Sequence, residues 1–189
     1  MRHGQTMFNE LDIAQGACDS PLTELGRRQP LYAKRWFETH HIEFDHAYAS
    51  TQERASDTLE LITDLPYQRL KGIKEMSFGA FDGGPNRILR TLGFVDNRDA
   101  LVPFGGESWH AVGNRAVAAL TEAMNKADHQ TVLAVSHGCT IFAFTHKWLP
   151  DATWEQLKMT NCCILKFEYE NEIFTLTDVI DHDFDKPLV

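Results

Sequence analysis

The sequence lacks the long hydrophobic runs that mark membrane and secreted proteins. Among its 189 residues, no stretch holds the roughly 18 consecutive apolar residues that a membrane span needs. The chain opens Met-Arg-His-Gly-Gln-Thr, without a basic and apolar leader. We therefore expect a cytoplasmic protein with no membrane partner.

The chain also lacks blocks of one charge and paired cysteines. Its 27 acidic and 18 basic residues give a formal charge of −9 without long runs of either sign, so we expect no nucleic-acid partner. The cysteines form no C-x-x-C pair and have no zinc-finger spacing, which predicts free thiols and no metal site. They are Cys18, Cys139, Cys162 and Cys163.

Length and periodicity predict a single α/β domain, 1–189. The composition, 43% hydrophobic and 24% charged, is that of one globular domain. Strand-like and helical periods alternate, which predicts a three-layer α/β/α fold with a mostly parallel central sheet and a C-terminal antiparallel hairpin. The expected helices are 23–40, 53–64, 108–124 and 140–148, and the expected strands are 47–49, 68–73, 131–136, 162–169 and 173–180.

Two short segments share the pattern of a histidine followed by a glycine. Arg2-His3-Gly4 opens the chain, and Ser136-His137-Gly138 follows its most apolar predicted strand. Active sites of parallel sheets lie at the carboxyl ends of the strands, and glycine lets backbone approach a ligand closely. Either histidine alone is more often a loop or core residue, but together they indicate a functional site.

Arg54 and Glu75 are two further candidates, each with an ordinary alternative. Arg54 lies in the first turn of the predicted helix 53–64, where the helix dipole disfavours a cation unless an anion lies between them. It indicates a phosphate site, although a surface salt bridge with Glu53 or Asp57 explains it equally well. Glu75 adjoins a glycine-rich loop with apolar neighbours, and it could act as a general acid or be an ordinary solvated carboxylate.

These candidates belong to one ordered pattern of five blocks. The blocks are Arg2-His3-Gly4-Gln5-Thr6 with Gln15-Gly16-x-x-Asp19-Ser20-Pro21-Leu22-Thr23, then Ser50-x-x-x-Arg54-Ala55, Glu75-x-x-x-Gly79, Gly106-Glu107-Ser108 and Ser136-His137-Gly138. In this order they resemble the histidine phosphatase superfamily, in its phosphoglycerate-mutase-like branch. The resemblance touches most of the chain, and a chance match of five ordered blocks is a poor explanation.

The resemblance implies phosphoryl transfer in two steps. His3 is expected to take the phosphoryl group and become a phosphohistidine. Arg2, Arg54 and His137 would clamp the phosphate oxygens, and Glu75 would protonate the leaving oxygen and later activate water. No metal or other cofactor is implied, because fixed cations stabilise the developing charge. Further phosphate contacts are expected from Asn9, Gln15, Gly16 and Gly138.

The family pattern also implies features that the sequence does not show directly. Family members carry a strand before the first block, but here only Met1 precedes Arg2. The first strand is therefore missing from the sequence, and we expect His3 to lack an anchoring sheet neighbour. Residues 76–107 are expected to form a cap over the site, with aromatic side chains that either line the pocket or pack in the core. These are Phe78, Phe81, Phe94, Phe104 and Trp109.

Three functions fit the pattern. A metal-independent phosphomonoesterase acting on a small phosphorylated metabolite is favoured, because the paired arginines of the mutases are absent between Glu75 and His137. The alternatives are a phosphoglycerate mutase, with 2,3-bisphosphoglycerate as its cofactor, and a phospho-ligand binding module without catalysis. The terminal hairpin leaves a sheet edge at which a homodimer could form.

Overall fold

A parallel sheet forms the centre of the molecule. The computed structural model describes residues 1–94 and 97–187. In it β1 (His46–Ser50) pairs in parallel with β2 (Tyr67–Leu70) on one side and with β3 (Val132–Val135) on the other. The order β2-β1-β3 confirms the parallel sheet predicted from the sequence. β2 is shorter than predicted because Lys71–Ile73 forms a 3₁₀ turn.

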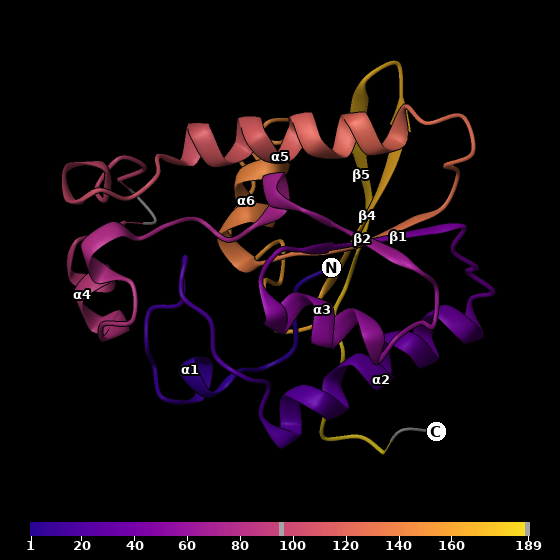
Figure 1. Cartoon of the computed structure of the whole chain (residues 1–189), viewed down its shortest axis with the longest axis horizontal. Coiled ribbons are helices and arrows are strands. Elements are labelled where there is room, and N and C mark those ends of the chain that lie inside the picture. Colours follow the sequence, from indigo (N-terminus) through magenta and orange to yellow (C-terminus); the bar gives the residue numbers. More distant parts are fainter. Residues whose placement is uncertain (95–96, 188–189) are drawn as a thin grey trace.

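Helices cover both faces of this sheet, which confirms the three predicted layers. α2 (Glu24–Thr39) and α3 (Glu53–Glu60) lie on one face. α5 (Trp109–Met124) and α6 (Gly138–Thr145) lie on the other, as Figure 1 shows. Two short helices, α1 (Met7–Glu10) and α4 (Asn86–Thr91), lie at the left of Figure 1, at the end of the sheet where β1 leads into α3.

The helix starts follow the predicted capping signals, with one exception that matters for the site. The hydroxyl groups of Thr23 and Ser108 cap the two long helices, as predicted. α6 begins at Gly138, two residues before the predicted start at Thr140, and His137 is its N-cap residue. Among residues 1–94 and 97–187, no helix combines the length and the apolar character that crossing a bilayer requires.

The first three residues take part in the sheet. The backbone of Met1–His3 runs beside the end of β3, where the His3 N–H donates to the Ser136 carbonyl at 3.0 Å. On the other side, the His3 carbonyl accepts from the Cys162 N–H at 3.2 Å. The expectation that His3 lacks a sheet neighbour is therefore wrong. The remaining length of β3 faces an apolar cavity of about 630 Å³ rather than another strand.

The C-terminal hairpin lies across this cavity from β3. β4 (Ile164–Glu170) and β5 (Ile173–Ile180) are antiparallel, as predicted. Asn171 and Glu172, which join them, have φ values of 51° and 63°, as a tight hairpin turn of the primed type requires. Phe174 packs against Phe144 of α6, with ring centroids 5.0 Å apart, and so fastens the hairpin to the helix layer.

The aromatic residues at and beside the expected cap, 76–107, pack mainly into the core. Phe104 is the exception, with 46% of its surface exposed. Residues 95 and 96 of the expected cap lie outside the described residues. Core packing, the alternative to a pocket lining, is the observed role of Phe78, Phe81, Phe94 and Trp109.

Candidate active site

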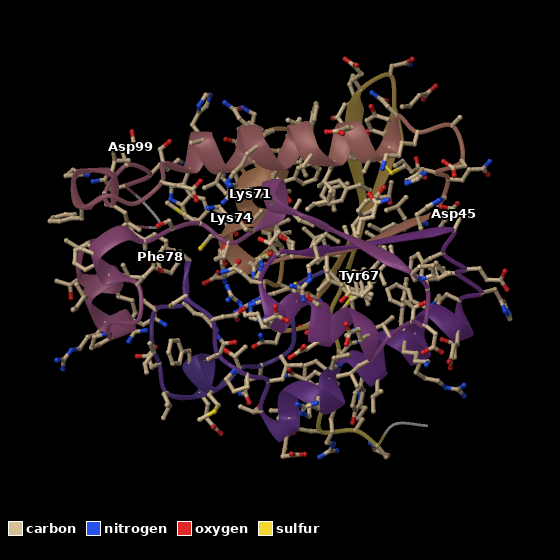
Figure 2. The ribbon with its side chains drawn as sticks, viewed as in Figure 1. Asp45, Tyr67, Lys71, Lys74, Phe78 and Asp99 are labelled. Atoms are coloured by element: carbon tan, nitrogen blue, oxygen red, sulfur yellow. The ribbon has the colours of Figure 1, made fainter. Side chains whose placement is uncertain are left out.

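The carboxyl end of the parallel sheet brings three of the predicted basic residues together. Arg54 comes from the first turn of α3, and His137 caps α6. The His3 and His137 ring centroids lie 5.1 Å apart, and Arg54 Nε lies 3.3 Å from His3 Nε2. All three side chains are buried. Figure 2 labels Lys74 and Phe78 on the segment that carries the fourth candidate, Glu75.

The ring of His3 is held in one tautomer. Its Nδ1–H donates to the Gly4 carbonyl at 2.7 Å, and a carbonyl can only accept, so the lone pair lies on Nε2. Burial, together with the charges of Arg54 and Arg2, holds the pKa of His3 well below its usual value. His3 is therefore neutral at pH 7, and Nε2 is available as a nucleophile.

The loop before α2 accepts hydrogen bonds from both terminal nitrogen atoms of the Arg54 guanidinium. Nη1 donates to the Cys18 carbonyl and to Asp19 Oδ1, both at 2.9 Å. Nη2 donates to two further carbonyls at 3.3 Å, those of Gln15 and Gly16. The alternative of a surface salt bridge with a neighbour on α3 is wrong, because Arg54 is fully buried and pairs with Asp19. The loop therefore fixes the guanidinium beside His3.

Three buried nitrogen atoms at this site have no hydrogen-bond partner among the described residues. They are Arg2 Nε and both ring nitrogens of His137. A buried polar group without a partner costs about 1–3 kcal/mol, so such atoms in one place indicate a ligand that supplies acceptors. Burial, with the charges of Arg54 and of neighbouring basic residues, lowers the pKa of His137 well below its usual value. The arrangement fits a buried anion.

Glu75 is buried and held by the amino end of α6. Oε1 accepts from the N–H groups of Met76 and Thr140, at 2.8 and 3.0 Å, and from the Thr140 hydroxyl at 3.1 Å. Among the described residues, Oε2 accepts from the Cys139 N–H alone, at 3.1 Å. The alternative of a solvated loop carboxylate is wrong, because Glu75 is only 5% exposed. Oε2, with one partner, is the oxygen that can exchange a proton with a substrate.

A half-buried ion pair holds the backbone that carries Glu75. Arg115 of α5 forms two bonds with the Glu107 carboxylate, at 2.9 and 3.0 Å. It also donates to the carbonyls of Gly72 and Lys74, both at 2.7 Å, and of Glu75 at 3.1 Å. Glu107 lies in one of the sequence blocks, but the role of Arg115 was missed, because three of its partners are backbone carbonyls that no side-chain pattern reveals.

Asn9 and Gln15 hold the loop around the site. Gln15 donates to Ser20 Oγ at 2.9 Å and accepts from the Thr6 hydroxyl at 2.6 Å. Asn9 Oδ1 accepts from the Thr6 N–H at 3.2 Å and from Asn161 Nδ2 at 3.3 Å. Direct contact of Asn9 and Gln15 with phosphate stays a prediction.

Gly16 lies where no side chain fits, and Gly138 lies where a side chain would press tightly on a neighbouring ring. A Cβ atom on Gly138 would lie 3.0 Å from the Trp154 ring and 3.6 Å from Arg2 Nε. A Cβ atom on Gly16 would lie 2.4 Å from an Asp82 carboxylate oxygen. Glycine at both positions therefore keeps backbone close to the site.

The segment 153–161, before β4, was missed by sequence reasoning. The carbonyl of Met159 accepts a hydrogen bond from Arg2 Nη1, and Asn161 Nδ2 donates to the His3 carbonyl at 3.1 Å. These contacts close one side of the site. The segment carries no motif, so only the folded chain shows its role.

Comparison with known proteins decides the family. The model of the histidine phosphatase superfamily (branch 1) matches residues 1–182. The chain belongs to the histidine phosphatase superfamily. The match confirms the family predicted from the sequence blocks.

Histidine phosphatase relatives include both mutases and phosphatases by name. "Probable phosphoglycerate mutase GpmB" of Proteus mirabilis is 30% identical over 188 residues, covering 90% of this chain and 84% of that protein. The solved structure of Bacillus stearothermophilus YhfR has a TM-score of 0.79 at 24% identity, covering 93% of this chain and 92% of that chain. Phosphoserine phosphatase of Entamoeba histolytica, in complex with 3-phosphoglyceric acid, has a TM-score of 0.76 at 25% identity, covering 97% and 95%.

Proposed function

We propose that this histidine phosphatase is a cytoplasmic, metal-independent phosphomonoesterase that acts on a small phosphorylated metabolite. The proposal rests on the tautomer of His3 and on the unpartnered donors around its ring. Its Nδ1–H is fixed on a carbonyl, its Nε2 is unprotonated, and unpartnered donors of Arg2 and His137 surround the same buried space. A neutral imidazole among donors without acceptors suits attack on a phosphoryl group.

In the first step, His3 Nε2 attacks phosphorus and the bond to the leaving oxygen breaks. A phosphoryl oxygen takes over the N–H of Arg54 that now donates to Nε2, which frees the lone pair. Arg2 and His137 donate to the other oxygens as charge spreads over them. Glu75, protonated on Oε2, gives its proton to the leaving oxygen.

In the second step, water attacks the phosphohistidine on His3. The Glu75 carboxylate takes a proton from this water, and the N–P bond breaks to release phosphate. His3 returns to its neutral tautomer, held by the Gly4 carbonyl. Glu75 is protonated again and ready for the next substrate.

Phosphoglycerate mutase is the second candidate, supported by the printed names of relatives such as the Proteus protein. A mutase needs spare cations to hold a substrate carboxylate. Between Glu75 and His137, three arginines have described bonds to side chains outside the phosphate clamp. These pairs are Arg90 with Asp12, Arg98 with His146 and Arg115 with Glu107. This engagement favours hydrolysis over transfer back to the substrate.

The test is phosphate release by the purified chain, with EDTA present, from p-nitrophenyl phosphate, phosphoserine and 3-phosphoglycerate. We expect turnover that falls at least about 10³-fold in His3→Ala and about 10²-fold or more in Glu75→Gln. The exposed His110→Ala serves as a matched control with unchanged turnover.

Two other results would overturn the proposal. Isomerisation that depends on 2,3-bisphosphoglycerate, without net phosphate release, identifies a mutase. Phosphate-ester binding by calorimetry without any turnover identifies a binding module.

A further inference from the structure

A second cluster of histidines lies at the amino end of β1. His46 is the first residue of that strand, and Asp128 with His129 belongs to the turn between α5 and β3. Asp45, which precedes His46, is labelled at the right of Figure 2, far from Phe78 of the active-site segment. The cluster is therefore separate from the phosphatase site.

The carboxylate of Asp128 contacts one nitrogen atom of each of the two imidazole rings. Oδ2 is 3.3 Å from His46 Nε2, and Oδ1 is 2.9 Å from His129 Nδ1. One donor atom from each of the three residues lies within 4.8 Å of the others. Two imidazole nitrogens and one carboxylate oxygen are a ligand set that suits Zn²⁺ and similar transition-metal ions.

Each histidine is held by its other ring nitrogen. His46 Nδ1 donates to Asp45 Oδ1 at 2.9 Å, and His129 Nε2 lies 2.7 Å from the hydroxyl oxygen of buried Tyr48. Asp45 also accepts from two N–H groups of the turn, Gln130 at 2.9 Å and Thr131 at 2.7 Å. Histidines that bind metals are oriented in this way, by an oxygen atom on the ring nitrogen that does not bind.

The contact between His46 and Asp128 requires a cation. Because Asp45 can only accept, Nδ1 of His46 carries the ring proton and Nε2 presents a lone pair to the Asp128 carboxylate. Two acceptors at 3.3 Å repel each other unless a second proton or a metal ion lies between them. We propose that His46, Asp128 and His129 bind one Zn²⁺ ion, with water completing the coordination.

The two rings must move slightly to form this site. They lie nearly parallel, at 14° with centroids 3.5 Å apart, and the proton that His129 Nδ1 donates to Asp128 moves to Nε2, beside the Tyr48 hydroxyl, when Nδ1 binds the ion. The side chain of His46 is 32% exposed and that of His129 only 4%, so His46 is the ring that turns. Asp128 is 74% exposed and gives the ion a route from solvent. Bound metal then fastens the turn to β1.

The test is Zn²⁺ binding by the metal-stripped full chain, followed by calorimetric titration and by the melting temperature. We expect one ion per chain, a higher melting temperature, and affinity at least about tenfold weaker in Asp128→Asn and His129→Gln. The control His110→Gln keeps the affinity. Asp45→Asn changes the residue that accepts from the outer nitrogen of His46 and from the turn, and it is expected to weaken binding about 10- to 100-fold.

Two outcomes would overturn the site. Zn²⁺ binding that survives His129→Gln but is lost in His3→Ala would place the ion at the catalytic imidazoles instead. No Zn²⁺ binding at all, and no rise in the melting temperature with Zn²⁺, would show that no metal ion lies between the groups. Phosphatase activity in EDTA is independent of both outcomes.

Discussion

The two pairs of histidines in this protein differ in what surrounds them. His3 and His137 are buried among arginines, tilted by 56° with centroids 5.1 Å apart. His46 and His129 are nearly parallel at 3.5 Å and share one carboxylate. The first pair has donors and positive charge to offer, and the second has the lone pair of His46 and the negative charge of Asp128. The same residue type therefore suits an anion at one end of the sheet and a cation at the other.

The comparison shows that neighbouring charge and burial, more than spacing in the sequence, set the chemistry of a histidine. Burial, together with the charges of Arg54 and Arg2, lowers the pKa of His3 and keeps it neutral and nucleophilic, because both oppose a further positive charge. A carboxylate beside His46 has the opposite influence, because it attracts a cation to the same lone pair. Three changes test this contrast at the catalytic pair.

Arg54→Lys is expected to break the anion site most strongly. Lysine has one ammonium group and cannot replace the guanidinium that bonds His3, Asp19 and the loop carbonyls. We expect kcat/KM to fall about 10²- to 10³-fold, because a preorganised donor to the phosphoryl group is lost. Steady-state kinetics with p-nitrophenyl phosphate measure this.

The matched control for that change is Arg69→Lys, an arginine on the surface. Arg69 pairs with Glu53 at 2.8 Å, and both side chains are more than a third exposed. Exposed pairs contribute about 0–1 kcal/mol, so activity should be unchanged. Equal losses in both variants would contradict a special role for Arg54.

Arg115→Lys is expected to have a smaller effect on activity, because Arg115 acts on the reaction only by holding the backbone that positions Glu75. We expect kcat to fall about 10- to 100-fold, since a shift of about 1 Å in a catalytic group has costs of this size. KM should change little because the phosphate clamp is untouched. The pH profile of kcat should also move, because the position of the proton donor changes.

A second variant distinguishes positioning of Glu75 from a purely structural role of the Arg115–Glu107 ion pair. Glu107→Gln removes the charge but keeps the shape, and it should reproduce the loss in kcat. Arg90→Lys, in an exposed pair with Asp12, is the control. A lower melting temperature in Arg115→Lys with an unchanged kcat and pH profile would contradict the positioning role.

Much of the fold and of the candidate site could be predicted from the sequence, because both depend on local patterns. The cap at Thr23, the apolar strand before Ser136 and the ordered blocks around His3 and Arg54 each leave a signal within a few residues. The start of α6 was predicted two residues late, because His137 has no capping side-chain bond that a pattern could reveal.

The parts that were missed depend on contacts between distant segments. Arg115 binds backbone carbonyls more than 40 positions away, and Met159 reaches Arg2 across 157 positions. The expectation that His3 lacks a sheet neighbour was wrong for a similar reason, because the distant backbone before β4 supplies a hydrogen-bond partner for His3. Such contacts form only when the chain is folded, and a single sequence contains no local trace of them.

The smallest expected effect is on stability, and its sign follows from the lowered pKa values of His3 and His137. Below the usual histidine pKa of about 6.5, the unfolded chain takes up protons that the folded chain does not. Stability is therefore fully present above this pH and falls as the pH decreases, by up to about 1.4 kcal/mol per pH unit for each histidine. Urea unfolding from pH 7.5 to 5.5, without phosphate, measures the slope. The double variant His3→Gln, His137→Gln should have a flatter slope, and an unchanged slope would show that these rings are not the groups kept neutral by burial and by the arginines around them.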